Sequence, residues 1–396
     1  MPTWIIEPRD PLIVRDGRPF GPDPGARARS LPFPFPSTIA GGVRTRAGLK
    51  SDGTFDHARA DKDHLDSVLK IGVRGPLLVA LDQAGQVAEC FAPAPADALL
   101  LRNANASGQE SDRYDAQRVR LLPLQPPAGS VYLPPRGEEP FLVGPRVARS
   151  EKPFDQPPRF WRWAAFERWL LDPKEGPCRT HDLGIAGPLS ESRMHVGIQA
   201  ATQTAEEGRL FQTIGLEFTG PKRERLALAV ESDGAFAHWA GGLAPLGGER
   251  RLVAWRAVQL DWPVCPQQVR ERIIAERACR VILLTPAHFT QGYRPTALLN
   301  ERAGVRPQLV AAAVPRPQVV SGWDLRTGRP KPSRRLAAAG SVYFLKLDAT
   351  DAAAIGRWID AIWMHNVSDD EQARRDGFGL AALGTWDGKP VAMEVK

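Results

Sequence analysis

The stretch LKIGVRGPLLVALDQAGQVAECF, residues 69–91, carries the clearest indication of the fold. Apolar residues gather within it in short runs at residues 69–73, 77–81 and 87–91. Runs of this length that are rich in Leu, Val and Ile predict β-strands. We therefore expect three strands to follow one another closely in this part of the chain.

The sequence before this stretch completes a recognisable order of elements. Thr3–Pro8 is mostly apolar and predicts a short first strand. Helical sequence begins at Pro36, where the hydroxyl of Ser37 or Thr38 can cap the free N–H groups of the first turn. The order strand, helix, strand, strand opens a ferredoxin-like βαββαβ unit.

The rest of the chain predicts an arm and a second unit of similar composition. Residues 159–171 predict a helix, and residues 194–200 and 211–218 predict the strands of a long hairpin with a polar tip. Further predicted strands lie at residues 225–231, 280–285, 309–314, 319–321 and 340–347, with helices at residues 269–278 and 352–364. We expect an α+β protein of two tandem ferredoxin-like (RRM-like) domains, namely residues 1–218, with inserted loops and the protruding β-hairpin, and residues 219–396.

Length and composition agree with a folded protein of about two domains. The chain has 396 residues, of which 43% are hydrophobic and 24% are charged, and its net charge is +7. A basic surplus is compatible with a polyanionic partner such as nucleic acid. The first residues lack the pattern of a signal peptide, and no apolar run is long enough to span a bilayer. We therefore expect a cytoplasmic protein without a membrane partner.

The sequence lacks the common motifs of catalysis. It contains no P-loop, no GxSxG, no HExxH and no GxGxxG after a strand. The four cysteines form no CxxC pair, which argues against zinc, and the carboxylates form no cluster for a two-metal nuclease. We therefore expect no catalytic residue, no metal and no cofactor. His195, beside Arg193 in the predicted hairpin, is the best single candidate for an acid or base in RNA cleavage.

Basic residues form several clusters that predict contacts with RNA phosphates, where neighbouring aromatic residues can stack on bases. The clusters are Arg15, Arg18, Arg27 and Arg29 around the first loop, Arg44 and Arg46 in the first helix, Arg146, Arg149 and Lys152 around Ser150, and Arg326, Arg329, Lys331, Arg334 and Arg335 in a loop with Trp323. A glycine-rich stretch at residues 241–251 contains Gly247 and Gly248 and ends with Arg250 and Arg251. Backbone N–H groups of such a loop can hold a phosphate. A solvated charged surface is the alternative for each cluster.

Short motifs spread along the chain carry a resemblance to a known family. They are IEPRDPL (residues 6–12), RDGRPF (15–20), PSTIAGGVRT (36–45), VGI (196–198), TAEEGRLF (204–211), LGGE (246–249), SGWD (321–324), AGSVYF (339–344) and GFG (377–379). Their order resembles the family of RAMP-superfamily proteins that form the third subunit of the type III-B (Cmr) CRISPR interference complex. The motifs cover nearly the whole chain.

This resemblance implies a non-catalytic, RNA-binding subunit that acts in antiviral defence against foreign RNA. Members hold the 5′ handle of the guide (CRISPR) RNA and connect the large polymerase-like Cmr subunit to the backbone Cmr subunit. The implied handle site comprises Ser37, Thr38, Arg44, Gly247, Gly248 and the loop around Arg334. In that loop this chain reads RRLAAAG (residues 334–340), where the family leads us to expect a proline before the glycine.

The same resemblance implies a role for the hairpin. Its outer part, from Thr202 through Thr204 to Phe211, is expected to be a thumb that lies against the target RNA near the 5′ end of the guide duplex. Arg193 is a further candidate for RNA contact in this hairpin.

Two other functions remain open on the sequence. The chain could be a metal-independent endoribonuclease that processes CRISPR repeat RNA with His195 as its acid or base. It could also be a purely structural subunit whose arginines contact acidic protein surfaces. Cleavage of repeat RNA distinguishes the first, and a weak dependence of RNA affinity on salt distinguishes the second.

Overall fold

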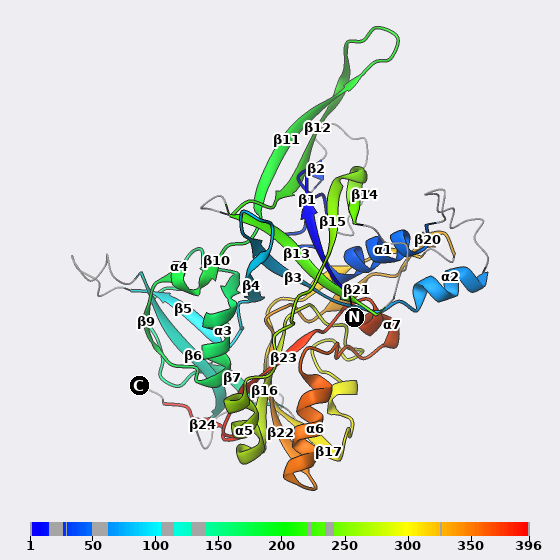
Figure 1. Ribbon diagram of the computed structural model, residues 1–396. Helices are drawn as coiled ribbons and strands as arrows, with labels where there is room; N and C mark the ends of the chain where they lie inside the picture. The colour runs from blue at the N-terminus through cyan, green and yellow to red at the C-terminus, as the bar shows by residue number, and fades with distance from the viewer. Residues whose placement is uncertain are drawn as a thin grey trace.

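The computed structural model describes residues 2–15, 27–28, 30–49, 62–103, 115–127, 140–220, 224–233, 241–324 and 327–394. Within these residues the chain forms two main antiparallel sheets, a third sheet beside them and a long hairpin arm that projects from the body (Figure 1). None of the helices in these ranges is long and apolar enough to cross a bilayer.

The first sheet contains eight strands in the order β10-β8-β4-β3-β13-β1-β15-β14, and all of its pairings are antiparallel. Its strands are β1 (Thr3–Pro8), β3 (Val73–Leu81), β4 (Val87–Pro93), β8 (Phe160–Arg162), β10 (Gly184–Ile185), β13 (Arg225–Ser232), β14 (Gly242–Pro245) and β15 (Leu252–Val258). The strands predicted at residues 3–8, 77–81, 87–91 and 225–231 are therefore confirmed.

Helix α1 (Pro36–Ala47) covers one face of this sheet. Its buried residues Ile39 and Val43 pack with Trp4 and Trp255 of the sheet. The predicted capping by Ser37 or Thr38 is wrong, because the N-cap residue is Phe35 and no side chain caps the helix. Pro36 has no N–H to satisfy, so it stabilises the first turn in place of a cap.

The strand predicted at residues 69–73 is also wrong. Residues Lys62–Leu69 form helix α2, and the sheet begins only at Val73. Leu65 and Val68 are the buried residues of this helix, with the spacing of one helical face. The apolar residues after them belong to the connection into β3.

A long insertion separates β4 from β13. It contains a third sheet of order β24-β6-β5, in which β7 and β9 also pair with β6. Its elements are β5 (Ala98–Arg102), β6 (Ala116–Gln125), β7 (Leu142–Pro145), β9 (Gly176–Cys178), α3 (Trp163–Leu171) and α4 (Thr180–Leu183), and it is completed by β24 (Val391–Ala392). The helix predicted over residues 159–171 begins later, at Trp163, because Phe160–Arg162 pairs with β4 as a strand.

The arm is the predicted hairpin. Strands β11 (Leu189–Ile198) and β12 (Ala205–Glu217) pair in antiparallel register, with His195 opposite Phe211. At its base, the short strand β2 (Arg27–Ala28) pairs in parallel with β12. Figure 1 shows the arm extending well beyond the body of the molecule.

The second sheet has the order β17-β22-β16-β23 and is antiparallel throughout. Its strands are β16 (Ala278–Leu283), β17 (Val305–Ala313), β22 (Val342–Ala349) and β23 (Ala381–Thr385), and the helices of this part of the chain are α5 (Gln267–Glu276), α6 (Ala352–Ile362) and α7 (Glu371–Arg375). Two short 3₁₀ helices are η2 (Gly248–Arg250) and η3 (Ala297–Leu299). Two small antiparallel ladders also form: β18 (Gln318–Val320) pairs with β21 (Arg334–Leu336), and β19 (Trp323–Asp324) pairs with β20 (Arg329–Pro330).

The change from one sheet to the other comes later than residue 219. Strands β13, β14 and β15 lie beyond the predicted boundary, yet all three belong to the first sheet. β1 pairs with β13 on one side and with β15 on the other, so the first sheet includes residues up to Val258. The second sheet begins with β16, after helix α5.

A buried ion pair joins the insertion to the second sheet. Arg280 in β16 and Asp97 before β5 both have fully buried side chains, and Arg280 Nη1 lies 2.5 Å from Asp97 Oδ2. Arg280 also donates to the backbone carbonyls of Trp169 at 2.7 Å and Thr385 at 2.9 Å. Asp97 accepts a further hydrogen bond from Trp169 Nε1 at 2.9 Å. Every group of this pair therefore has a partner inside one core that includes both parts of the chain.

Candidate nucleic-acid interface

The base of the arm sits on the segment that follows β1. Leu12 and Leu216 exchange both of their backbone hydrogen bonds, each at 2.9 Å. Gly215 permits this approach, because a Cβ there would lie 2.7 Å from Cβ of Pro11. Arg15, at the end of the described part of this segment, is exposed beside the arm base. The segment and the arm therefore form one continuous surface.

The glycine-rich loop packs against the same segment. Gly248 N donates to the carbonyl of Ile13 at 2.7 Å. Gly247 has φ +74°, and a Cβ there would lie 2.5 Å from the Ile13 carbonyl oxygen, so only glycine fits. The turn leaves Arg250 exposed, whereas Arg251 is ion-paired with Glu249 at 3.0 Å. The glycine-rich loop therefore packs directly against the segment that ends at Arg15.

Helix α1 contributes to this face through one of its two arginines. The guanidinium of Arg46 lies over the ring of Trp255 at 5.5 Å, and burial lowers its pKa. Arg44 is different, because only 5% of it is exposed. Its Nη1 lies 2.5 Å from Asp376 Oδ1, and its Nη2 donates to the carbonyl of Ile71 at 2.8 Å. We therefore remove Arg44 from the predicted phosphate contacts, since it joins α1 to the end of α7.

The basic loop of the second half lies next to the start of α1. Phe35, Leu336 and Phe378 share a small core, which holds the β18–β21 ladder beside Ser37 and Thr38. Arg334 forms an ion pair with Asp370, whereas Arg335 on the other face of β21 is exposed. Arg329 and Lys331 are also exposed in this loop. The basic loop at residues 329–335 therefore lies beside the N-terminal end of α1.

His288 lies beside the Arg334–Asp370 ion pair. Its Nδ1 is 3.5 Å from Asp370 Oδ2. Burial and the charge of Arg334 lower the pKa of His288, and the carboxylates of Asp370 and Asp369 oppose this shift. The neutral form of the imidazole is therefore favoured, and the carboxylate of Asp370 forms its ion pair with Arg334.

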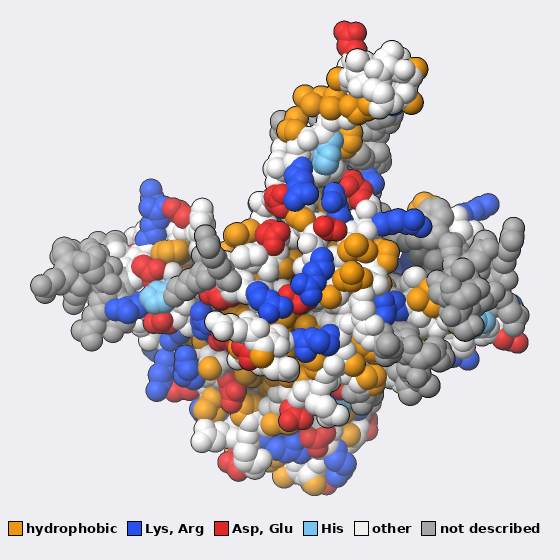
Figure 2. All heavy atoms as spheres, turned by 45° about the horizontal axis from the view of Figure 1, so that its top comes forward, with side chains coloured by type: hydrophobic (Ala, Val, Ile, Leu, Met, Phe, Trp, Pro, Cys, Tyr) orange, Lys and Arg blue, Asp and Glu red, His pale blue; other side chains and the backbone are white. Residues whose placement is uncertain are grey.

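The two faces of the arm differ in character. On one face, the His195 and Phe211 rings are stacked with centroids 5.2 Å apart, and His195 Nε2 lies 2.9 Å from Thr213 Oγ1. The register places Met194, Val196 and Leu210 together on the opposite face, where each is 43–59% exposed. Figure 2 shows apolar side chains along the arm, and basic side chains mixed with acidic ones around its base.

The other predicted residues of the arm are bound to their neighbours. Arg193 is ion-paired with Glu191 at 2.5 Å. At the tip, the hydroxyl of Thr202 lies 2.7 Å from that of Thr204 and donates to Gln199 at 2.9 Å. The polar side chains at the tip are thus hydrogen-bonded to one another within a turn.

The cluster around Ser150 lies elsewhere. Arg146 and Arg149 flank the third sheet, where they are ion-paired with Glu394 at 2.8 Å and with Glu175 at 3.2 Å. Lys152 is exposed in the same region. Figure 1 places this sheet apart from the arm, so the structure does not bring this cluster to the arm face. Arg18, Arg29 and Arg326 lie outside the described residues, as do the side chains of Arg27 and Trp323.

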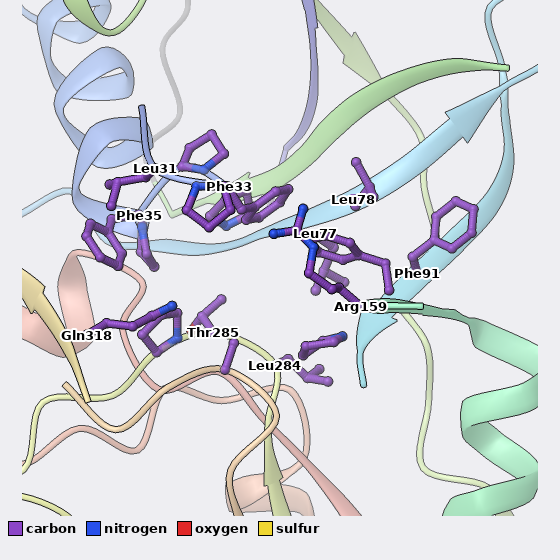
Figure 3. Close-up of a pocket in the computed structure, with 18 of the residues that line it drawn as sticks. Leu31, Phe33, Phe35, Leu77, Leu78, Phe91, Arg159, Leu284, Thr285 and Gln318 are labelled. Atoms are coloured by element: carbon purple, nitrogen blue, oxygen red, sulfur yellow. The ribbon is translucent and has the colours of Figure 1, made fainter. Parts of the chain in front are cut away.

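A hollow between the two main sheets was not anticipated. It has a volume of about 260 Å³ and lies where the proline-rich stretch before α1, strands β3 and β4, and loops of the second sheet meet (Figure 3). Most of its lining is apolar. The signal that could have found it is the alternation of proline and phenylalanine in LPFPFP, residues 31–36, which predicts a rigid extended segment rather than ordinary core.

The described residues do not suggest a metal centre. No group of three or more His, Cys, Asp or Glu side chains in these ranges is arranged to hold a metal ion. The chemistry available on the arm face is that of exposed guanidinium groups, backbone N–H groups and aromatic rings. Such groups bind phosphates and nucleobases.

Comparison with known proteins gives one match to a family. The family model described as CRISPR-associated protein (Cas_Cmr3) matches residues 4–386. No curated protein sequence matches the chain. The fold is similar to chains in two cryo-EM structures of type III-B Cmr-beta bound to cognate target RNA. The first, which also holds AMPPnP, is 16% identical with a TM-score of 0.44, and the second is 14% identical with a TM-score of 0.46. Each similarity covers 86% of this chain and 86% of the other.

Proposed function

Since the chain belongs to the Cas_Cmr3 family of CRISPR-associated proteins, we propose that it is the RNA-binding subunit of a type III-B CRISPR effector complex that holds the 5′ handle of the guide RNA. The observation that carries this proposal is the convergence of distant segments on one face. Residues 12–15, helix α1, the loop at residues 246–251 and the base of the arm meet there.

The proposed fold behind this function is a pair of ferredoxin-like units. Strands β15-β1-β13-β3 and strands β23-β16-β22-β17 each follow the order fourth, first, third, second within their own unit. This is the strand order of a βαββαβ unit. In the first unit α1 lies between the first two strands, and in the second α6 lies between the last two. The long insertion then occupies the connection between the second and third strands of the first unit.

The handle is proposed to cross the face between the arm base and α1. Arg15 and Arg250 are exposed there, and Arg250 lies in the glycine loop, whose Gly248 N donates to the Ile13 carbonyl. Arg335 with its basic neighbours extends the positive charge toward the start of α1. Phosphates neutralised by these side chains release counterions, so the affinity for RNA should fall steeply with salt.

The arm is proposed to be the thumb that meets the target RNA near the 5′ end of the guide duplex. Its exposed stripe of Met194, Val196 and Leu210 offers apolar contact to a base pair or to a neighbouring subunit. The large polymerase-like subunit and the backbone subunit are the proposed protein partners. Arg146 and Arg149 lie away from the handle face and are ion-paired with Glu394 and Glu175. They therefore suit contacts with these protein partners better than contacts with RNA phosphates.

We further propose that the chain binds without cleaving. The one histidine on the arm is stacked on Phe211 and bonded to the hydroxyl of Thr213. An acid or base in RNA cleavage needs a proton-transfer partner on the substrate within reach. A nuclease would lose its cleavage of repeat RNA on His195→Ala, whereas the proposed role predicts no cleavage by either form.

The test is binding of the purified chain, alone and with the large subunit, to guide RNAs with an intact or a scrambled 5′ handle. We expect a preference for the intact handle and no cleavage. Arg250→Ala and Arg335→Ala should weaken binding and reduce its dependence on salt, and Arg146→Ala serves as the control away from the face. Equal affinity for both RNAs would refute handle recognition, and salt-independent affinity would favour the purely structural subunit.

A further inference from the structure

A groove of about 510 Å³ opens where the third sheet meets the second. Phe141, just before β7, forms a parallel bridge with Ala311 of β17, and its N–H donates to the carbonyl of Val310 at 2.8 Å. Beyond this bridge β7 turns away to pair with β6, while β17 continues along β22. The groove lies in the fork between the two strands, with residues 142–143 on one side and residues 312–315 on the other. None of its lining residues belongs to the arm or to the segments around the arm base.

The side chains that line this groove are apolar, and several are exposed. Nine of the eleven lining residues are alanine, valine, leucine or proline, and the other two are Phe141 and Tyr293. Phe141 is 38% exposed, Tyr293 is 46% exposed and Leu142 is 56% exposed. Large apolar side chains that are exposed together are typical of a surface that binds another molecule. The groove therefore offers burial to the apolar side chains of a ligand.

The groove also presents backbone groups. Tyr293 is the single lining residue with a polar side-chain atom, so the other polar atoms of the lining belong to the main chain. β17 is the edge strand of the second sheet, and β22 is its ladder partner among the described strands. Unpaired groups at the edge of a sheet can form hydrogen bonds with an added extended segment. A segment that enters the fork can therefore bond to the backbone while its side chains pack on the apolar lining.

The border of the groove is positively charged. Arg294 and Arg316 directly follow the lining residues Tyr293 and Pro315 in the sequence. Arg316 is exposed and Arg294 is half-buried, and neither has an ion-pair partner in the described part of the chain. No aspartate or glutamate lines the groove. This border favours a ligand that carries carboxylates beside its apolar side chains.

We propose that this groove, which we call the fork groove, docks an extended apolar segment of a partner protein whose neighbouring carboxylates meet Arg294 and Arg316. The inference rests on the proposed function for its choice of partners, which are the large polymerase-like subunit and the backbone subunit. The lining favours protein over RNA. Its aliphatic residues give a base little surface for stacking, and no lining side chain carries a positive charge for a phosphate.

The test measures binding of the full chain to the purified large subunit and, separately, to the purified backbone subunit, at low and at high salt. Phe141→Ser and Tyr293→Ser each remove an apolar side chain and should weaken binding of one subunit by about tenfold or more. Arg316→Glu reverses a border charge and should slow association with the same subunit by about threefold or more at low salt, and by less at high salt. Val264→Ser, at an apolar position that is 81% exposed and outside the groove, is the matched control and should bind as the unaltered chain does.

Two further measurements on the same preparations assign the effect to docking. The urea midpoint of each variant checks that it is folded. The affinity for guide RNA with an intact 5′ handle should not change, because the fork groove lies apart from the arm face. If Phe141→Ser fails to fold, Tyr293→Ser and Arg316→Glu, whose side chains are exposed, still decide the result.

The outcomes separate this inference from the proposed function. If the groove variants bind both subunits as the unaltered chain does, the fork groove is not a docking site, and the proposed function stands. If they bind both subunits normally but lose affinity for handle RNA, the occupant is RNA and the docking proposal is overturned. If the unaltered chain binds neither subunit, the assembly role in the proposed function is refuted, and this inference with it.

Discussion

Replacing Asp97 by asparagine should destabilise the chain far more than any substitution of an exposed ion pair. Asparagine keeps the shape of Asp97 and an acceptor for Trp169 Nε1, but it removes the counter-charge of Arg280. Arg280 is fully buried, so its charge would remain in the core with only backbone carbonyls as partners. Breaking a buried pair in this way costs about 3–5 kcal/mol. That is a large part of the roughly 5–15 kcal/mol that stabilises a typical domain.

Urea unfolding measures this cost, followed by tryptophan fluorescence and by circular dichroism. Trp169, which donates a hydrogen bond to Asp97, is one of the eleven tryptophans that contribute to the fluorescence signal. Coincidence of the two signals checks that one transition is observed. The matched control is Asp155→Asn, which breaks the exposed ion pair with Arg102 and should leave the stability unchanged.

A double variant tests the reasoning further. Asp97→Leu together with Arg280→Met removes both charges, and it should be less destabilised than the two single variants added together. If Asp97→Asn cost less than about 1 kcal/mol, or no more than the exposed control, the pair would not be what joins the insertion to the second sheet.

Four further predictions concern the candidate interface and its surroundings. Gly247→Ala should destabilise the loop by at least about 1–3 kcal/mol, because of its φ and the contact with the Ile13 carbonyl, and weaken handle binding in the same titration. Gly41→Ala, where an added Cβ meets nothing within 4 Å, should instead stabilise α1 by about 0.5–1 kcal/mol in urea unfolding. Arg44→Met should lower the free energy of unfolding by about 3–5 kcal/mol, since it leaves Asp376 buried without its ion-pair partner. An unchanged urea midpoint together with weakened RNA binding would instead mean that Arg44 contacts a phosphate. The pKa of His288 is lowered in the folded chain, so the unfolded chain binds its proton first as the pH falls. Stability should therefore decrease as the pH falls from about 6.5 through the folded pKa, and His288→Gln should flatten this part of the urea-midpoint profile.

Much of the fold could be predicted because its elements carry local signals. Strand β1 is a short apolar run, and α6 has an apolar face with helical spacing, and both were found with nearly correct bounds. Helix α2 was missed because its buried residues, Leu65 and Val68, are few, and the apolar residues after them alternate as in a strand. The boundary between the sheets was misplaced because it depends on the pairing of β1 with β15, which no local pattern reveals.

The candidate site was predicted less well than the fold. The glycine loop could be recognised because its backbone conformation demands glycine at Gly247. Arg44 could not be distinguished from a phosphate ligand, because its partner Asp376 lies 332 residues away in the sequence. The hollow between the sheets stayed unnoticed for a similar reason, since it forms only where segments from both halves of the chain meet. Composition indicates that arginines are present, but tertiary packing decides which of them reach the surface.

The pairing of β24 with β6 has a consequence for synthesis on the ribosome. Val391 pairs with Leu124, so the partner of this end of β6 is translated roughly 270 residues after it, whereas β5, β7 and β9 pair with β6 much earlier. At about 5–20 residues per second, this edge of β6 waits on the order of 15–50 s for its neighbour. Throughout that interval the nascent chain presents an unpaired strand edge to other chains and to chaperones. Slow translation of the second half should therefore lower the yield of soluble protein even when the finished structure is stable.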